Sequence, residues 1–167
     1  NRTESYYEVV KEEGKWKLLD VMAYDMEYLL PDDLLTRKVD VPEDEKTSVL
    51  GVVASNADYM NKENLKAYMA QLEDDFEGYE AMEEYLGSIF ELYDLKTTID
   101  KSQIIDYTGN TAHVYAEQTT VKTDDSDYYD NSSILVHKLV KDKDGQWKFA
   151  ETHMIEYNFL DDEEVDM

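Results

Sequence analysis

Runs of strand-forming residues occupy both ends of the chain, and a charged turn interrupts each run. Near the start, strand formers at 6–10 precede Lys11-Glu-Glu-Gly14, and a second run continues to about residue 30. Near the end, residues 133–140 precede Lys141-Asp-Lys-Asp-Gly145, and a second run continues to 160. β-Branched and aromatic residues on both sides of a glycine-containing turn are typical of a β-hairpin. The pattern therefore predicts one hairpin at each end of the chain.

The two predicted hairpins are similar residue by residue. Aligning their turn glycines brings together three further identical pairs: Trp16 with Trp147, Lys17 with Lys148, and Leu29 with Leu160. Internal similarity of this kind points to a repeated structural unit. We therefore expect residues 1–33 to be the last hairpin of an upstream repeat. Because an isolated hairpin is only marginally stable in water, we expect it to pack on the complete domain or on another chain.

Between the hairpins, apolar residues recur at helical spacing in three segments. Pro31 and Pro42 bracket a polar stretch, from which we predict a linker at 34–46, and Thr47 or Ser48 is a candidate cap for the first helix. The apolar positions of the three segments are Val49, Leu50, Val52, Val53, Ala57 and Met60, then Leu65, Tyr68, Met69 and Leu72, then Tyr79, Met82, Leu86, Ile89, Phe90 and Tyr93. The sequence thus predicts three consecutive helices.

Two more strands are predicted at 95–107 and 111–122, separated by the turn residues Thr108-Gly-Asn110. The second alternates, with Ala112, Val114 and Ala116 on one face and His113, Tyr115 and Glu117 on the other. Three helices followed by four long antiparallel strands predict an α+β fold, with the helices packed on one face of a curved sheet. We expect this domain to span 47–160, after the extra hairpin and before an acidic tail at 161–167.

The charge of the chain narrows the range of partners. Acidic residues outnumber basic ones by 40 to 16, and the net charge is −24. Such a chain repels nucleic acid and anionic membrane surfaces, so we expect neither as a partner. Cysteine is absent, which excludes disulfides and thiolate chemistry, and no apolar run is long enough to cross a membrane. The lack of cysteine and a start at Asn1 without methionine favour a secreted or surface-anchored bacterial protein.

The acidic turn at the end of the chain invites comparison with a calcium-binding loop. Asp142, Asp144 and Gly145 follow part of the EF-hand spacing, but Val140 stands where the first ligand would be. We interpret the segment as a hairpin turn and expect neither a metal nor a cofactor.

Five short motifs are similar to segments of the NTF2-like superfamily, the cone-shaped fold of SnoaL-type cyclases and ketosteroid isomerases. They are Asp58-Tyr-Met-Asn61, Asn64-Leu-Lys-Ala-Tyr-Met69, Phe90-Glu-Leu-Tyr-Asp94, Thr111-Ala-His-Val114 and Asp144-Gly-Gln-Trp-Lys148. The block 47–160 resembles this superfamily, which implies a cystatin-like cone with a pocket between the helices and the concave face of the sheet. Members include enzymes and non-catalytic modules, so the resemblance leaves the function open.

Isomerases of the superfamily use a buried aspartate base and its dehydratases use a His–Asp pair, but no local motif of either kind is recognisable, and no catalytic residue is assigned. A cluster of His113, Tyr115, Glu117 and His137 would suit general acid–base chemistry. Alternatively, these residues line the exposed face of the sheet or a dimer interface. His153 replaces Met22 of the first hairpin, which marks either a pocket or ordinary drift. These five polar residues of the final domain are the candidates for a ligand pocket.

Two classes of function follow from these observations. The leading hypothesis is a non-enzymatic binding or assembly module of a larger protein, with a small apolar ligand or a protein partner, and with homodimerisation through the sheet as one form of assembly. The alternative is a SnoaL- or ketosteroid-isomerase-like enzyme acting by general acid–base chemistry on a small apolar substrate. A third hypothesis is that the acidic surface recruits a basic partner. A carboxylate beside His113, Tyr115 and His137 in one cavity would favour the enzyme.

Overall fold

The computed structural model describes residues 2–12, 15–27 and 31–160, and the chain forms two compact units, residues 1–34 and 35–167. The first unit contains the antiparallel strands β1 (Arg2–Glu12) and β2 (Lys15–Glu27). The hairpin predicted at the start of the chain is therefore present, although its turn glycine, Gly14, lies outside the described residues.

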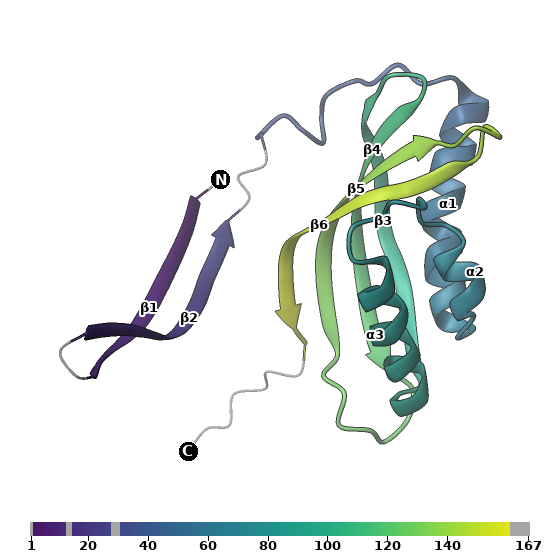
Figure 1. Ribbon diagram of the computed structural model, residues 1–167. Coiled ribbons are helices and arrows are strands. Elements are labelled where there is room, and N and C mark those ends of the chain that lie inside the picture. Colours follow the sequence, from purple (N-terminus) through teal and green to yellow (C-terminus); the bar gives the residue numbers. More distant parts are fainter. Residues whose placement is uncertain (1, 13–14, 28–30, 161–167) are drawn as a thin grey trace. The chain divides into compact units, whose positions relative to one another are not determined.

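The second unit places helices on one face of a curved four-stranded sheet (Figure 1). The strands are antiparallel and lie in the order β3-β4-β5-β6. This arrangement confirms the predicted α+β fold. The elements are α1 (Glu43–Asn61), α2 (Leu65–Met69), α3 (Tyr79–Leu92), β3 (Leu95–Tyr107), β4 (Thr111–Lys122), β5 (Asn131–Lys141) and β6 (Trp147–Phe159).

The hydrophobic core lies between the helices and the concave face of the sheet. Ala112, Val114 and Ala116 of β4 are fully buried and belong to the same apolar cluster as Val49 and Val53 of α1. Alternate residues of a strand point to opposite faces, so the intervening residues of β4 face away from the helices. The alternation predicted for this strand is confirmed.

The first helix begins at Glu43, earlier than the predicted cap at Thr47 or Ser48. Pro42 occupies the cap position and acidic residues fill the first turn. Proline suits a helix start because a backbone N–H there would have no partner within the helix. Carboxylates in the first turn are stabilised by the helix dipole. The hydroxyls of Thr47 and Ser48 instead donate to the carbonyls of Glu43 and Asp44, both at 2.9 Å.

Trp147 connects the start of α1 to the final hairpin. Its indole Nε1 donates to Glu45 Oε2 at 3.0 Å, and Lys141 Nζ pairs with the other Glu45 oxygen. The same ammonium lies 5.2 Å from the centre of the indole ring. The Trp147 ring therefore packs in the core, while its N–H belongs to a group of polar contacts that links α1 to the final hairpin.

Asn61 connects the end of α1 to β3 through two hydrogen bonds. Its side chain accepts from Thr97 N at 2.6 Å and donates to Thr97 O at 2.8 Å. Thr97 is itself buried, and its hydroxyl lies 3.0 Å from that of Thr120 on β4.

Replacing Asn61 with alanine should lower the free energy of unfolding by about 1–3 kcal/mol, because two backbone groups of a buried residue lose their partner. Urea unfolding followed by circular dichroism would measure the change. Lys62→Ala is the matched control, since it removes only an exposed ion pair with Asp58 and should change stability by less than about 0.5 kcal/mol. Equal effects of the two substitutions would contradict the assigned role of Asn61.

Candidate functional site

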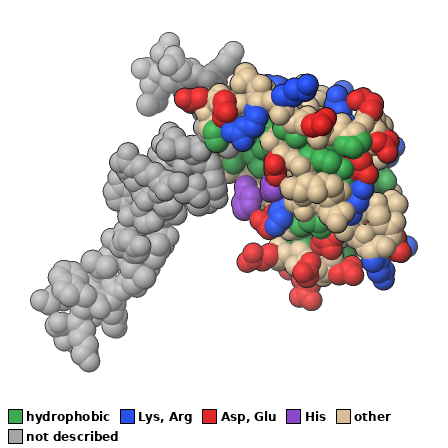
Figure 2. Space-filling view, turned by 90° about the horizontal axis from the view of Figure 1, so that it is seen from above, with side chains coloured by type: hydrophobic (Ala, Val, Ile, Leu, Met, Phe, Trp, Pro, Cys, Tyr) green, Lys and Arg blue, Asp and Glu red, His purple; other side chains and the backbone are tan. Residues whose placement is uncertain are grey.

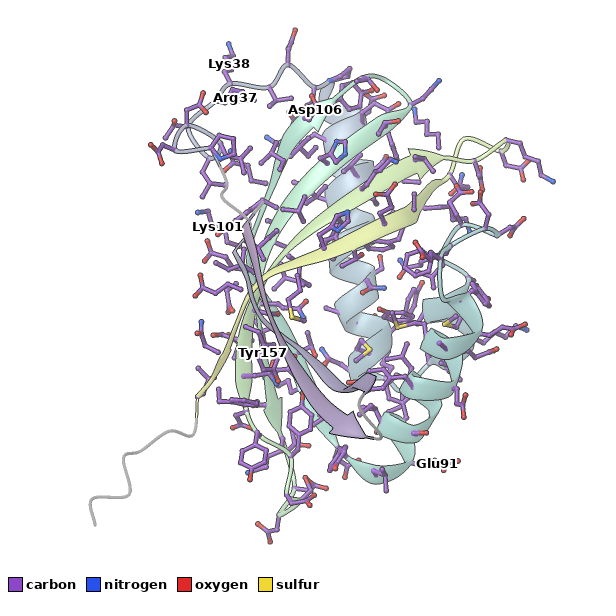
Figure 3. All side chains as sticks on the ribbon, turned by 60° about the vertical axis from the view of Figure 1, so that its left-hand side comes forward. Arg37, Lys38, Glu91, Lys101, Asp106 and Tyr157 are labelled. Atoms are coloured by element: carbon purple, nitrogen blue, oxygen red, sulfur yellow. The ribbon has the colours of Figure 1, made fainter. Side chains whose placement is uncertain are left out.

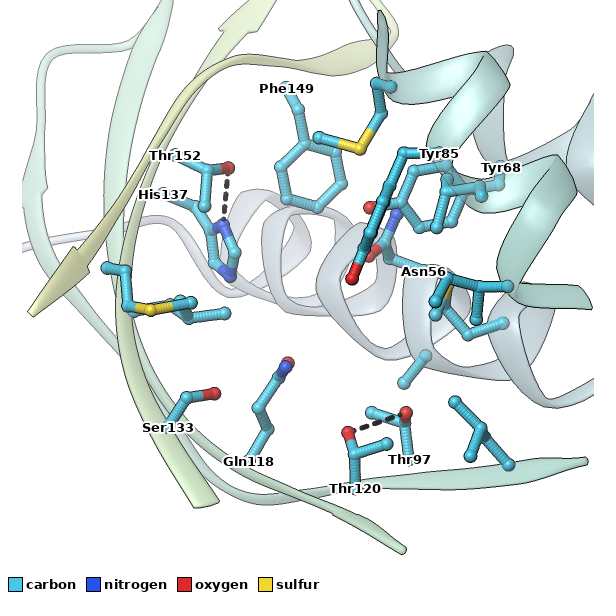
Figure 4. A pocket seen from close by; sticks show the side chains of 18 of the residues that line it. Asn56, Tyr68, Tyr85, Thr97, Gln118, Thr120, Ser133, His137, Phe149 and Thr152 are labelled. Carbon is cyan, nitrogen blue, oxygen red and sulfur yellow. Dashed lines mark hydrogen bonds between the residues drawn. The ribbon is translucent and has the colours of Figure 1, made fainter. Parts of the chain in front are cut away.

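A cavity of about 230 Å³ lies between α1, α3 and the concave face of the sheet (Figure 4). Its apolar wall includes Leu86, Leu135 and Phe149. Its polar wall includes amide, hydroxyl and imidazole groups. Among the residues described by the structure, those lining the cavity include no aspartate, glutamate, lysine or arginine. The cavity is therefore polar in part but carries no carboxylate, ammonium or guanidinium group.

His137 of β5 lies in this wall and is 6% exposed. Its Nδ1 is 3.0 Å from the Thr152 hydroxyl on β6, and its ring meets Phe149 edge-to-face at 5.1 Å between centroids. Burial lowers the pKa of His137 from 6.5 to about 4, so the ring is neutral at physiological pH. The ring nitrogen not bonded to Thr152 is turned toward the cavity (Figure 4).

Gln118 and Ser133 supply further hydrogen-bonding groups. They are direct cross-strand partners on β4 and β5, and both side chains point into the cavity (Figure 4). Within the described part of the chain, neither the Gln118 amide nor the Ser133 hydroxyl has a hydrogen-bond partner. Both groups are therefore available to a molecule in the cavity.

Aromatic side chains form the mouth of the cavity. Tyr85 of α3 and Tyr157 of β6 line it and are 61% and 42% exposed. Burial raises the pKa of Tyr157, and nearby Tyr85 adds to the effect. The ring of Tyr157 contacts that of Phe159 at 5.2 Å, and Phe159 contacts Tyr129 at 5.6 Å. The mouth therefore offers flat apolar surfaces with hydroxyl groups at their edges.

Three of the predicted pocket residues lie on the opposite face of β4. His113, Tyr115 and Glu117 alternate with the core residues of that strand. Tyr115 donates to Glu117 Oε1 at 2.9 Å, and Lys101 Nζ lies 3.3 Å from the same oxygen, on the side of the sheet away from the helices (Figure 3). Burial, followed by the bonded Glu117, raises the pKa of Tyr115 to about 12.

His113 and His153 also lie away from the cavity. His113 Nδ1 lies 3.3 Å from Asp106 Oδ2 on the outer face. His153 lies 3.3 Å from Glu151, and it points away from the cavity because its neighbours in β6, Thr152 and Met154, both line it. The structure thus does not bring the five candidates together. His137 alone among them lines the cavity.

The register of β4 and β5 explains why the predicted cluster does not form. His137 is the cross-strand partner of Val114, a core residue, and paired residues share a face. Sequence reasoning also missed Gln118 and Ser133. A signal existed for Gln118, because it lies four residues after Val114 and so occupies a core-facing position with a polar side chain.

The surroundings of His137 favour the neutral form of its ring. The partner of His137 is a hydroxyl, and the described residues that line the cavity include no carboxylate to balance the charge of an imidazolium ion. Protonating such a buried ring would leave an uncompensated charge in an apolar surrounding. Hydrogen bonds to an uncharged molecule carry no such penalty.

The outer surface is strongly charged. Figure 2 shows acidic side chains distributed over the face seen there, with basic ones between them. No helix in the described residues is both long and apolar enough to cross a membrane.

A family model described as the C-terminal domain of anti-sigma-I factor RsgI9 matches residues 51–160. A search of curated proteins found no match.

Several solved structures share the fold at low sequence identity. A protein of unknown function with a cystatin-like fold from Nostoc punctiforme has a TM-score of 0.58 and 14% identity, covering 70% of this chain and 93% of its own. A putative scytalone dehydratase from Novosphingobium aromaticivorans has a TM-score of 0.59 and 15% identity, with coverages of 69% and 87%. A ketosteroid isomerase-like protein from Erwinia carotovora atroseptica has a TM-score of 0.54 and 18% identity, with coverages of 69% and 99%. These similarities establish the NTF2-like fold.

Proposed function

Because this chain belongs to the family of the C-terminal domain of anti-sigma-I factor RsgI9, we propose that it is a non-catalytic binding module of a larger protein and that its cone holds a small uncharged ligand. The observation that carries the proposal is a cavity whose lining has hydrogen-bonding groups but no carboxylate, ammonium or guanidinium.

The polar wall fits an uncharged ligand. Gln118 and Ser133 offer groups without partners, and the free nitrogen of His137 adds a third hydrogen-bonding group. A charged ligand would lose its hydration in this cavity without gaining an opposite charge, and that loss costs several kcal/mol. A volume of about 230 Å³ corresponds to roughly eight water molecules of liquid, which suits a molecule with a single ring.

The apolar wall and the aromatic mouth of the cavity fit the apolar part of an uncharged ligand. Phe149 and Leu135 form part of the wall, and Tyr85 and Tyr157 stand at the opening. Pockets of this kind bind by apolar contact and gain orientation from a few polar groups. In a protein of the anti-sigma-factor type, a ligand bound here would act on the rest of the chain only through a difference in its affinity for two conformations.

The alternative function, general acid–base catalysis, is less well supported by the geometry. His137 would have to accept a proton although its pKa is about 4 and its partner is the Thr152 hydroxyl. An effective base has a pKa near the working pH and a partner that orients it.

Three matched probes test the proposal: benzyl alcohol, benzoate and benzylammonium, which share a ring and differ in charge. In amide NMR titrations of the 167-residue chain, benzyl alcohol should shift the signals of Gln118, Ser133 and His137 in a saturable way. The two ions should leave these signals unchanged at equal concentrations. Gln118→Leu should weaken the binding of benzyl alcohol, whereas Lys101→Ala, on the outer face, should not. Equal binding of the ions, or shifts confined to the outer face, would contradict the proposal.

A second arm of the same test addresses catalysis. The rate at which the α-hydrogens of cyclohexanone exchange in D₂O at pH 7, followed by NMR, should be the same with the natural chain and with His137→Ala. An acceleration that the substitution abolishes would establish the enzymatic alternative.

A further inference from the structure

The two hairpins of the chain agree in more than their sequence. β1 and β5 are 11 residues long, and β2 and β6 are 13 residues long. In each hairpin the tryptophan is the cross-strand partner of a lysine, Lys11 with Trp16 and Lys141 with Trp147.

Both hairpins also have a β-bulge at the same step from the lysine–tryptophan pair, after the third cross-strand pair counted from it. In β1–β2 the pair Val9 with Leu18 is followed by Glu8 with Asp20, so Leu19 is left without a partner. In β5–β6 the corresponding pairs are Leu139 with Phe149 and Lys138 with Glu151, and Ala150 is left without one. A bulge bends its strand and increases its twist. The two hairpins are therefore curved in the same place.

The strand β5 shows what such a hairpin does in a complete domain. It pairs with β6 on one edge and with β4 on the other, so both rows of its backbone groups are used. Within the described residues, β1 pairs with β2 alone. One edge of β1 therefore presents backbone N–H and C=O groups that a further strand can pair with.

We propose that β1–β2 is the closing hairpin of a second sheet of the same fold, in which a strand from a segment of the longer protein preceding residue 2 pairs with the free edge of β1. The occupant of this edge is then the counterpart of β4 in an upstream cone. The matching lengths, the matching lysine–tryptophan pair and the matching bulge carry this assignment. It does not depend on whether the cavity of the second unit binds a ligand.

Hydrogen–deuterium exchange with mass spectrometry tests the proposal on two chains: the 167-residue chain and the natural longer protein that includes the segment before residue 2. The peptide 131–141, from the internal strand β5, serves as the standard in each sample. In the longer protein, the peptide 2–12 should exchange about tenfold more slowly than in the 167-residue chain and approach the standard, because backbone hydrogen bonds protect amides from exchange.

Two results would overturn the proposal. Equal protection of peptide 2–12 in both chains would mean that its edge is covered without the upstream segment. Rapid exchange in both chains would mean that no strand covers it.

Discussion

Replacing Trp147 with alanine should lower the free energy of unfolding of the second unit by about 3–5 kcal/mol, the usual cost of removing a buried aromatic side chain. Trp147 is 5% exposed and belongs to the main core cluster, where its ring also contacts Tyr107 at 6.3 Å between centroids. Domains of this size have a free energy of unfolding of roughly 5–15 kcal/mol, so the substitution should remove a large part of the stability of the second unit.

The polar side of Trp147 adds to this effect. Its indole N–H and Lys141 together bind the Glu45 carboxylate, and the hydrogen bond from Lys141 is the larger cause of the lowered pKa of Glu45. Trp147→Phe keeps most of the buried ring and loses the N–H, so it should cost less, about 1–2 kcal/mol. Urea unfolding followed by circular dichroism compares the two variants. An alanine variant within about 1 kcal/mol of the natural chain would show that the tryptophan is not an anchor of the fold.

Lowering the pH from 6.5 to 4 should remove roughly 3 kcal/mol of stability through His137 alone. Burial holds its pKa at about 4 in the folded chain, compared with 6.5 in the unfolded chain. Between these values the unfolded chain binds the proton and the folded chain does not, so stability falls as the pH falls. The contribution is complete above pH 6.5 and is lost as the pH falls through 4, at about 1.4 kcal/mol for each pH unit.

His137→Gln isolates this effect from the titration of the many carboxylates. Glutamine does not titrate, so the stability difference between the natural chain and the variant should shrink steadily from pH 6.5 to 4. Urea unfolding at a series of pH values measures that difference. Parallel pH profiles for the two chains would show that His137 is not held neutral by burial.

Much of the fold follows from local patterns in the sequence. The alternation in β4 and the apolar stripe of α3 predicted these elements because side-chain direction repeats every two residues in a strand and about every 3.6 in a helix. The start of α1 was mispredicted because two local signals competed: the hydroxyls of Thr47 and Ser48, and the proline and carboxylates before them. The hydroxyls found partners within the helix, so the earlier signal determined its start.

The site depends on contacts that no local pattern encodes. The register between β4 and β5 places His137 opposite Val114 and Gln118 opposite Ser133, and a shift of one residue would have turned His137 to the outer face. The register between these strands is set by packing across the whole sheet. The sequence of the loop that joins β4 to β5 does not specify that register. The sequence by itself therefore determined the elements and their order. Only the tertiary structure decided which of the polar residues share a cavity, because that depends on how the strands align once the core is closed.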